Sequence, residues 1–503
     1  MAIKRWVADA DTTITNAYKQ NMRTRATGSN MGLADSLEVF HIYGQQDSGS
    51  SENARILIKF PISNVSSSRN SGDIPVSGNV DFYLKMFNVE HPFTLPRGYN
   101  LAISAISKSW DEGSGMDMDS YSNSGSANWI SAASASSGVT NWTAQGGDYH
   151  TEPVFTASFD NGTEDIEVNI TDLVEQWLSG AALTAAQTDG AYAKQNYGFG
   201  IKLSGTAESA LSSSYTKKFS ARGTEFFFKK PVLEARWNSS RQDDRGNLYY
   251  SSSLANSEDN LNTVYLYNYV RGQLRNIPSV GTGLVYVSVY SGSKDNTEPS
   301  GSRLVLVSDG THVTSDNAYV VTGGYVSTGI YSASFALTAA ATKLTNIFEV
   351  WHSGTTQYHT GTITPQTLQG SNMNPTTKYA MAVSNLKSSY NSTETARFRI
   401  STRLKDWSPN IYSKAKNEPE LSLVESASYR VYRVSDNMNV VPYGTSSTYH
   451  TLLSYDISGS YFDLDMSLLE PDYSYAIKIA LYNGAISSFI EQDETFKFRV
   501  EPV

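Results

Sequence analysis

Cysteine is absent from the 503 residues of this sequence. Its absence excludes disulfide bonds, thiolate metal sites and cysteine nucleophiles. A chain without cross-links must draw its stability from apolar burial and backbone hydrogen bonds, which requires domains large enough to bury a core. Because compact domains cluster at roughly 100–150 residues, we expect several of them.

Charged residues are also scarce, at 17% of the chain, and the net charge is −10. Binding to a phosphate backbone needs clustered Lys and Arg, so nucleic acid is not an expected direct ligand. Polarity comes from Ser, Thr, Asn, Gly and Tyr in place of Lys and Glu. Since Tyr, Thr, Val and Phe suit a pleated surface, this composition favours strands over helices.

Long apolar runs are missing as well. No stretch approaches the roughly 20 apolar residues of a membrane span. No apolar run precedes Asp9, so we expect no secretory signal. A cysteine-free chain with a polar, extracellular-like composition and no export signal fits a virus particle that is assembled inside a bacterium and released by lysis. A surface protein that is processed or exported by another route is the alternative.

Short stretches with a period of two recur through residues 1–237. Apolar and polar positions alternate at 56–60, at 80–86 and again at 198–203. This alternation is typical of half-buried strands, and Gly, Ser, Asn and Pro turns separate the stretches. A final strand is predicted over 226–237. The segment is therefore expected to be a sandwich of many short strands.

One helix is predicted within this segment, over residues 169–180. Thr171 or Asp172 offers an N-terminal cap, and Gly180 offers a C-terminal stop. Leu173, Val174, Trp177 and Leu178 share one face of this helix. We expect that face to close one end of the sandwich.

Residues 238–261 are polar and rich in turn-forming residues, so they are predicted to be a linker. Within it, Asp243-Asp244-Arg245-Gly246-Asn247 is interpreted as a solvated turn in preference to a cation site. Strand-like runs then recur at sandwich-like intervals over 262–370 and over 376–503. The runs are 264–267, 284–290, 304–307, 331–337 and 347–351, followed by 379–383, 396–400, 429–434 and 475–482.

The last domain carries Pro471, Tyr473 and Tyr475 just before its run at 475–482. Such a Pro-x-Tyr-x-Tyr sequence is common in immunoglobulin-like sandwiches, where a Tyr hydroxyl ties a corner. The sequence therefore predicts an all-β chain of three tandem β-sandwich domains. The first contains one short helix, and the other two are immunoglobulin- or fibronectin-like.

Six blocks in residues 1–237 follow one another in an order that matches a known family. They are Asp9–Ile14, Arg55–Phe60, Trp110–Gly115, the pairs Asn128-Trp129 and Asn141-Trp142 with Gly146-Gly147-Asp148, Ile170–Trp177, and Asn196–Ile201. In these blocks the segment resembles the DNRLRE domain, a carbohydrate-binding-module-like jelly roll of secreted bacterial proteins and phage virion proteins. The resemblance implies a jelly-roll fold for residues 1–237 and nothing about the rest.

Two departures separate this segment from the family pattern. An insertion, Met116–Tyr121, follows the Trp-Asp-Glu-Gly run, and Tyr149-His150 stand where a second acidic residue is expected. The fold therefore transfers more readily than a ligand. Together with the missing export signal and the two trailing sandwiches, the resemblance implies a bacteriophage virion component of the neck or collar, tail or capsid surface. Its expected partners are capsid, neck or tail proteins and copies of itself.

An acidic cluster lies in a Gly- and Ser-rich loop of the first domain, formed by Asp111, Glu112, Asp117 and Asp119. Hard oxygen ligands at alternating spacing are what Ca²⁺ prefers, so calcium is the one cofactor these residues suggest. Turn capping by the Asp side chains, with no cofactor bound, is the favoured interpretation.

Two tryptophans, Trp129 and Trp142, lie among Ser, Ala, Asn and Thr and are expected to be partly exposed. There they could stack on the sugar rings of a host surface glycan, since aromatic faces bind the apolar faces of sugars. The alternative is that most of the tryptophans belong to the core, as Trp177 on the helix does.

No catalytic pattern stands out. The seven histidines, at 41, 91, 150, 312, 352, 359 and 450, are scattered, and His352 and His359 are too far apart for a same-face helical metal pair. Neither a Gly-x-Ser-x-Gly elbow, a phosphate loop nor His-Glu-x-x-His occurs. We expect a non-enzymatic structural protein of a virion. A secreted or surface carbohydrate-binding protein is the alternative, and a polysaccharide-degrading enzyme is a third hypothesis.

Overall fold

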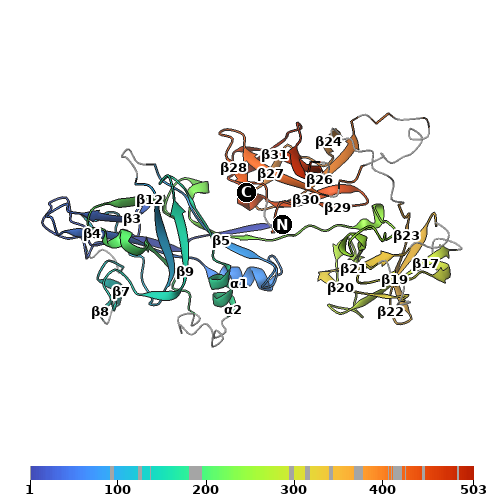
Figure 1. The fold of residues 1–503 in the computed structure, drawn as a ribbon, viewed down its shortest axis with the longest axis horizontal. Coiled ribbons are helices and arrows are strands. Elements are labelled where there is room, and N and C mark those ends of the chain that lie inside the picture. Colours follow the sequence, from blue (N-terminus) through green and yellow to red (C-terminus); the bar gives the residue numbers. More distant parts are fainter. Residues whose placement is uncertain are drawn as a thin grey trace. The chain divides into compact units, whose positions relative to one another are not determined.

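The chain forms two compact units, Met1–Asn238 with Thr445–His450, and Ser239–Gly444 with Thr451–Val503 (Figure 1). The described part of the chain is nearly all β, with two α-helices, as the composition predicts. This computed structural model describes residues 2–90, 96–122, 127–135, 138–179, 195–293, 299–311, 318–338, 344–366, 378–405, 407–408, 411, 422–424, 426–444, 448–483 and 486–503.

The first unit is a sandwich of two antiparallel sheets, as its period-two pattern predicts. The four-stranded sheet has the order β1 (Ile3–Val7), β13 (Val232–Arg236), β5 (Asp81–Met86) and β10 (Ile166–Asn169). The seven-stranded sheet has the order β12 (Tyr215–Ser220), β3 (Ser36–Tyr43), β4 (Ser51–Lys59), β11 (Phe199–Leu203), β6 (Tyr99–Ile106) and β9 (Tyr149–Phe159), with β2 (Ala10–Thr15) paired to β4.

The main core of this unit lies between the two sheets. Ile56 and Ile58 of β4 contribute to it from one sheet, and Phe82 and Leu84 of β5 from the other. None of these four side chains has exposed surface, which is what the alternation in the sequence predicts.

The last strand of the unit is shorter than the sequence predicts. β13 begins at Val232, because a 3-10 turn, η3 (Phe227–Lys229), and Pro231 precede it. Phe226 and Phe227 are 59% and 39% exposed, so the apolar run at 226–228 is not part of the core.

The predicted helix is present as α2 (Thr171–Ser179), and it buries Leu173, Val174 and Trp177. Two hydrogen bonds of Thr171 stabilise its first turn. The Thr171 N–H donates to Asn169 Oδ1 at 3.0 Å, and the Thr171 hydroxyl accepts a hydrogen bond from the Phe82 N–H at 2.8 Å. Gly180, the predicted stop, lies outside the described residues.

A second helix, α1 (Ile62–Asn70), lies beside α2 (Figure 1) and is not predicted by the sequence. Arg69 of α1 donates two hydrogen bonds to the Glu175 carboxylate of α2, at 2.7 and 2.5 Å. This bidentate ion pair fixes the orientation of both side chains.

The second sandwich is one sheet that folds over on itself at β20 (Val321–Ser327). Residues 321–323 pair with β17 (Val285–Ser293), and residues from 324 pair with β21 (Ile330–Leu337). Gly323 stands at this switch, where a Cβ would come within 2.6 Å of the Ser332 carbonyl oxygen. The other strands of this sheet are β14 (Asn262–Tyr267), β22 (Ile347–Ser353), β23 (Thr356–Ile363), β18 (Pro299–Arg303) and β19 (Leu306–Val307). The hairpin β15 (Tyr269–Val270) and β16 (Gln273–Leu274) is a separate two-stranded sheet.

The third sandwich pairs a four-stranded with a six-stranded sheet. As predicted, the Tyr475 hydroxyl ties a corner, donating to the Glu470 carbonyl oxygen at 2.7 Å. The first sheet has the order β24 (Tyr379–Val383), β26 (Thr395–Leu404), β30 (Gly459–Asp465) and β29 (Ser454–Asp456). The second has the order β25 (Ser389–Asn391), β33 (Phe496–Glu501), β31 (Ser474–Asn483), β27 (Ala427–Arg433) and β28 (Asn439–Val441), with β32 (Ser488–Glu491) paired to β31.

The prediction of a solvated turn at 243–247 is wrong. Asp243 is 3% exposed, and Arg245 donates from Nε to Glu349 at 2.6 Å and from Nη1 to Asp243 at 2.7 Å. Burial raises the pKa of Asp243 to about 6 in spite of the neighbouring Arg245 charge. The segment predicted as a linker thus supplies a buried ion cluster to the second sandwich, and Leu248 joins the hydrophobic core of that sandwich.

Arg245→Met should destabilise the second unit strongly, because it leaves the fully buried Glu349 without its cation. Breaking one side of a buried pair costs about 3–5 kcal/mol. Arg499→Met is the matched control, since its ion pair with Asp472 is exposed and worth less than about 1 kcal/mol. Differential scanning calorimetry measures both, and equal transition temperatures for the two variants would contradict the assignment.

Candidate functional site

A second hydrophobic cluster lies on the outer face of the seven-stranded sheet, opposite the main core. It joins Leu57 of β4 and Ile14 of β2 to Trp110, Trp129 and Trp142 from the segment between β6 and β9. That segment, residues 107–148, contains the hairpin β7 (Ser131–Ala135) and β8 (Gly138–Asn141). The tryptophans therefore fasten its described part to the sheet.

The expected exposure of Trp129 and Trp142 is wrong. They are 6% and 5% exposed, and Trp110 is 7% exposed. The Trp142 indole N–H donates to the Asn128 carbonyl oxygen at 2.8 Å, and the Trp110 indole N–H donates to that of Tyr197 at 2.7 Å. Rings that are this deeply buried offer no face to a sugar, so these tryptophans are structural.

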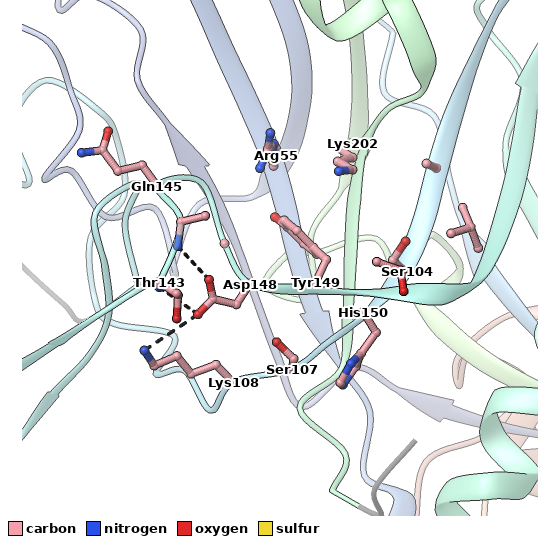
Figure 2. Close-up of a pocket in the computed structure, with 15 residues that line it drawn as sticks. Arg55, Ser104, Ser107, Lys108, Thr143, Gln145, Asp148, Tyr149, His150 and Lys202 are labelled. Carbon is pink, nitrogen blue, oxygen red and sulfur yellow. Dashed lines mark hydrogen bonds and ion pairs between the residues drawn. The ribbon is translucent and has the colours of Figure 1, made fainter. Parts of the chain in front are cut away.

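An open groove of about 860 Å³ lies where this segment meets the sheet (Figure 2). Its floor is the outer face of four strands, with Arg55 on β4, Lys202 on β11, Ser104 on β6 and Tyr149 on β9. The residues Thr143, Ala144, Gln145, Gly147 and Asp148 line its rim, together with Ser107 and Lys108. Most of the lining residues carry a hydroxyl, amide or charged group, but the surface that they expose to the groove is more apolar than polar.

Tyr149 and Arg55 are held rigidly in this floor. The Tyr149 ring crosses over Gly200 of β11, where a Cβ would collide with it. Its hydroxyl donates to the Gly146 carbonyl oxygen at 2.7 Å, and burial raises its pKa to about 12, so it stays neutral. Arg55 donates to the same carbonyl at 2.8 Å and to Glu208 at 2.6 Å, with its guanidinium 5.1 Å from the centre of the Trp129 ring.

Lys202 differs from the other charged groups of the groove. Its ammonium lies 5.1 Å from the centre of the Tyr149 ring. Within the described residues, no carboxylate lies within 4 Å of it. Burial lowers its pKa, and the positive charge of Arg55 lowers it further. The Glu208 carboxylate, which pairs with Arg55, opposes these two effects and raises the pKa of Lys202. Two cations thus face the same groove beside this one carboxylate.

Asp148 closes the opposite side of the groove (Figure 2). Its carboxylate accepts hydrogen bonds from the Thr143 and Ala144 N–H groups at 2.9 and 3.0 Å, and the Lys108 ammonium lies 3.8 Å away. Burial alone would raise its pKa, but these hydrogen bonds lower it below the ordinary value. The rim is therefore a fixed turn built around a carboxylate.

The predicted calcium ligands are engaged separately. Asp117 accepts hydrogen bonds from the Asp119 and Ser120 N–H groups at 2.8 and 2.6 Å, the turn capping that the sequence favours. Asp119 accepts one from the Gln20 N–H at 2.8 Å. Asp111 is exposed, and Glu112 binds Arg222. Within the described residues, no three His, Asp or Glu side chains lie close enough together to share a metal ion.

Glu112 belongs instead to a buried charge cluster with Asp11. Glu112 Oε1 accepts hydrogen bonds from the Asp11 N–H at 2.8 Å and from Arg222 Nε at 2.6 Å, and Asp11 accepts one from the Arg222 N–H at 2.6 Å. Asp11 is 1% exposed, and burial raises its pKa to about 7. Charged residues from two family-like blocks, Asp9–Ile14 and Trp110–Gly115, therefore lie together in this cluster.

The histidines form no catalytic arrangement in the described residues, and His91 and His312 lie outside them. The Ser288 hydroxyl is 2.9 Å from His352 Nε2, but Ser288 has no exposed surface and could not reach a substrate. His352 and His359 lie on the paired strands β22 and β23. No helix in the described part is long and apolar enough to cross a membrane.

Sequence reasoning missed the groove residues. Four of them fall within or beside the family-like blocks, namely Arg55, Gly146, Asp148 and Tyr149. Their spacing in the sequence matches no motif that indicates a binding site. One signal was present in the sequence. Lys202 interrupts the apolar run 199–203 at an outward-facing strand position, which places a cation on the sheet opposite the core.

No family model matches the chain, and no curated protein matches it. Among solved structures with detectable similarity is a crystal structure of DIP-gamma IG1+IG2. It is 10% identical, covers 53% of this chain and 96% of its own, and has a TM-score of 0.13. The fold assignment therefore depends on the strands themselves.

Asp11→Asn should raise the melting temperature of the first unit at pH 8.5, where Asp11 is a buried anion. This gain in melting temperature should shrink as the pH falls to 5. The Asp11 carboxyl takes up a proton near pH 7 in the folded protein but only near pH 4 in the unfolded chain. A difference of one pKa unit between the folded and the unfolded state corresponds to about 1.4 kcal/mol of stability. At pH 8.5 the melting temperature of the variant should therefore exceed that of the unaltered chain by several degrees.

Asp148→Asn is the control for this pH dependence. Its carboxylate is stabilised by hydrogen bonds and is ionised throughout pH 5–8.5, so the loss in melting temperature should be the same at both ends of the range. A gap for Asp11→Asn that does not change with pH would disprove the buried-anion assignment.

Proposed function

We propose that this chain is a non-enzymatic structural component of a bacteriophage virion, a neck, tail-associated or capsid-decorating protein. It acts through contacts with other virion proteins and with copies of itself. The resemblance of residues 1–237 to the DNRLRE domain and the succession of β-sandwiches along a cysteine-free chain support this proposal. The observation that carries it is an exposed apolar hairpin on the third sandwich.

The hairpin of β31 and β32 exposes four large apolar side chains. Tyr482 is 44%, Ile486 53%, Phe489 40% and Ile490 40% exposed. Tyr482 and Phe489 are paired across the two strands with their rings 5.3 Å apart. Ile490 pairs with Leu481 and therefore lies on the opposite face of the hairpin from Tyr482 and Phe489. Exposed aromatic and aliphatic side chains on a hairpin are typical of a protein interface.

The use of charge in the fold also supports a structural role. On the four-stranded sheet of the first unit, Arg5 and Arg236 pair with Glu234 at 2.5 and 2.6 Å, and Arg236 also pairs with Glu167 at 2.8 Å. Burial would raise the pKa of Glu234, but these cations hold it far below its ordinary value. Such a carboxylate is a poor proton donor or acceptor near neutral pH.

A secreted or surface carbohydrate-binding protein is the second candidate. The observation that favours it is the polar groove of the first unit. The buried tryptophans Trp129 and Trp142 do not favour it, because they present no ring face to a ligand.

The virion assignment is tested on particles released from cells that carry the gene. Banded on a density gradient and quantified by mass spectrometry, the chain should appear in the particle band at a fixed ratio to the major capsid protein. Recovery only as free protein at the top of the gradient would contradict the proposal.

The contribution of the hairpin is tested by the triple variant Tyr482→Ser, Phe489→Ser, Ile490→Ser. It should lower the occupancy of the chain on the particle at least tenfold, because aromatic and aliphatic anchors contribute most to interface affinity. Leu254→Ser, which alters a side chain that is 97% exposed outside this patch, should leave occupancy unchanged. Both variants should keep a melting temperature close to that of the unaltered chain, because the substituted side chains are exposed.

A further inference from the structure

Lys217 of β12 is the one buried lysine in the described part of the chain, with 1% of its surface exposed. Its Nζ donates to Asn88 Oδ1 at 2.7 Å and to the Gly162 and Glu164 carbonyl oxygens at 3.0 and 2.7 Å. These three acceptors are neutral oxygen atoms, so no direct ion pair with them offsets the burial of the amine.

Two aromatic rings flank this amine and exclude water from it. Lys217 Nζ lies 4.7 Å from the centre of the Phe159 ring and 5.2 Å from that of Phe219, and neither ring has exposed surface. Burial lowers the pKa of Lys217 to about 8, although the charges of Glu164 and Asp165 oppose this effect. A desolvated lysine of lowered pKa is a nucleophile, because only the neutral amine has a free electron pair.

The side-chain amide of Asn88 is held directly against this nucleophile. Asn88 forms an antiparallel bridge with Phe219 of β12, two residues from Lys217 in the sequence. Its own N–H donates to Asp165 Oδ1 at 2.7 Å, which fixes its position from the other side. Since a C=O bond is about 1.2 Å long, the amide carbon of Asn88 lies within about 4 Å of Lys217 Nζ. Attack on a carbonyl carbon requires an approach of this kind.

Glu164 is the carboxylate that is free to transfer protons beside this pair. Its Oε1 accepts a hydrogen bond from the Asn161 N–H at 2.6 Å, whereas its Oε2 is buried without a hydrogen-bond partner among the described residues. Burial would raise the pKa of Glu164, but the Asn161 N–H and the Lys217 charge lower it. The group is therefore ionised near neutral pH and able to accept a proton.

We propose that Lys217 and Asn88 join in an intramolecular isopeptide bond that the folded chain forms by itself, with Glu164 transferring the protons. The bond between Nζ and Cγ forms, and the bond between Cγ and Nδ2 breaks. Glu164 takes a proton from the ammonium of Lys217 and returns one to the leaving nitrogen of Asn88. The ammonium and the amide thus give one new amide and one ammonium ion, and no oxidant or other reactant is consumed.

The bond joins the two sheets of the first sandwich. Asn88 follows β5 of the four-stranded sheet, and Lys217 lies on β12 of the seven-stranded sheet. A cross-link between residues so distant in sequence stabilises a fold by reducing the entropy of the unfolded chain. A chain without cysteine gains in this way a covalent link that does not depend on redox conditions. The inference goes beyond the proposed virion role and does not depend on it.

Mass spectrometry of the intact, unaltered chain tests the proposal directly. Its mass should be about 17 Da below that of the sequence, because one ammonia is lost. Tryptic digestion should give residues 86–97 joined to residues 203–218, with cleavage after Lys217 blocked. A mass equal to that of the sequence would overturn the proposal. So would a loss of ammonia confined to one peptide, which is the result of asparagine cyclisation.

Three variants test the assigned roles. Lys217→Met and Asn88→Ala should each restore the full mass, because they remove the amine or the amide. Glu164→Gln should leave most of the chain without the cross-link, although its side-chain oxygen can still accept the hydrogen bond from Asn161. Complete cross-linking of Glu164→Gln would contradict the assignment of proton transfer to this residue.

Lys218→Met and Glu38→Gln are the matched controls. These residues form a partly exposed ion pair at 3.2 Å beside the site, and both variants should lose ammonia as the unaltered chain does. Glu164→Gln keeps the hydrogen-bonding groups of Lys217 and Asn88 but lacks the bond, so its melting temperature should fall by about 10 °C or more. Glu38→Gln should melt within a few degrees of the unaltered chain. Equal melting temperatures for Glu164→Gln and Glu38→Gln would contradict a stabilising cross-link.

Discussion

The burial of three tryptophans on the outer face of the seven-stranded sheet is the interaction on which the rest of the first unit depends. Trp110, Trp129 and Trp142 fasten the segment 107–148 to a sheet face that would otherwise be solvated. Because the segment is fastened there, its last turn, around Asp148, forms a fixed rim. The groove on this face therefore depends on a second hydrophobic cluster, distinct from the core between the sheets.

Several ion pairs of this chain are buried or half-buried within the fold. Arg245 with Glu349, and Arg222 with Glu112, connect segments that are distant in sequence within their own units. Lys202 is the exception within the groove. We therefore base the proposed role in protein contacts on the exposed apolar hairpin of the third sandwich.

The all-β fold, α2 and the Tyr475 corner could be predicted because each follows from local periodicity or a local motif. α1 could not, since its Ser-rich sequence has only Ile62 and Val65 as buried apolar residues and is held by the pairing of Arg69 with Glu175. The same limit explains the errors at Trp129, Trp142 and Arg245. Polar neighbours in sequence suggest exposure, whereas burial is decided by residues distant in sequence, such as Leu57 and Glu349. The groove depends on such contacts, and only Lys202 gave a local sign of it.

Native-state hydrogen exchange of the segment 107–148 tests the central claim most directly. The Gly146 amide donates to the Trp129 carbonyl oxygen at 2.7 Å, the Trp142 amide to that of Ile130 at 3.0 Å, and the Ser107 amide to that of Asp148 at 3.0 Å. These three amides should be protected as strongly as those of β6 and β11, because the segment and the sheet form one cooperative unit. Exchange at the rate of an unstructured peptide, while β6 stays protected, would contradict the account.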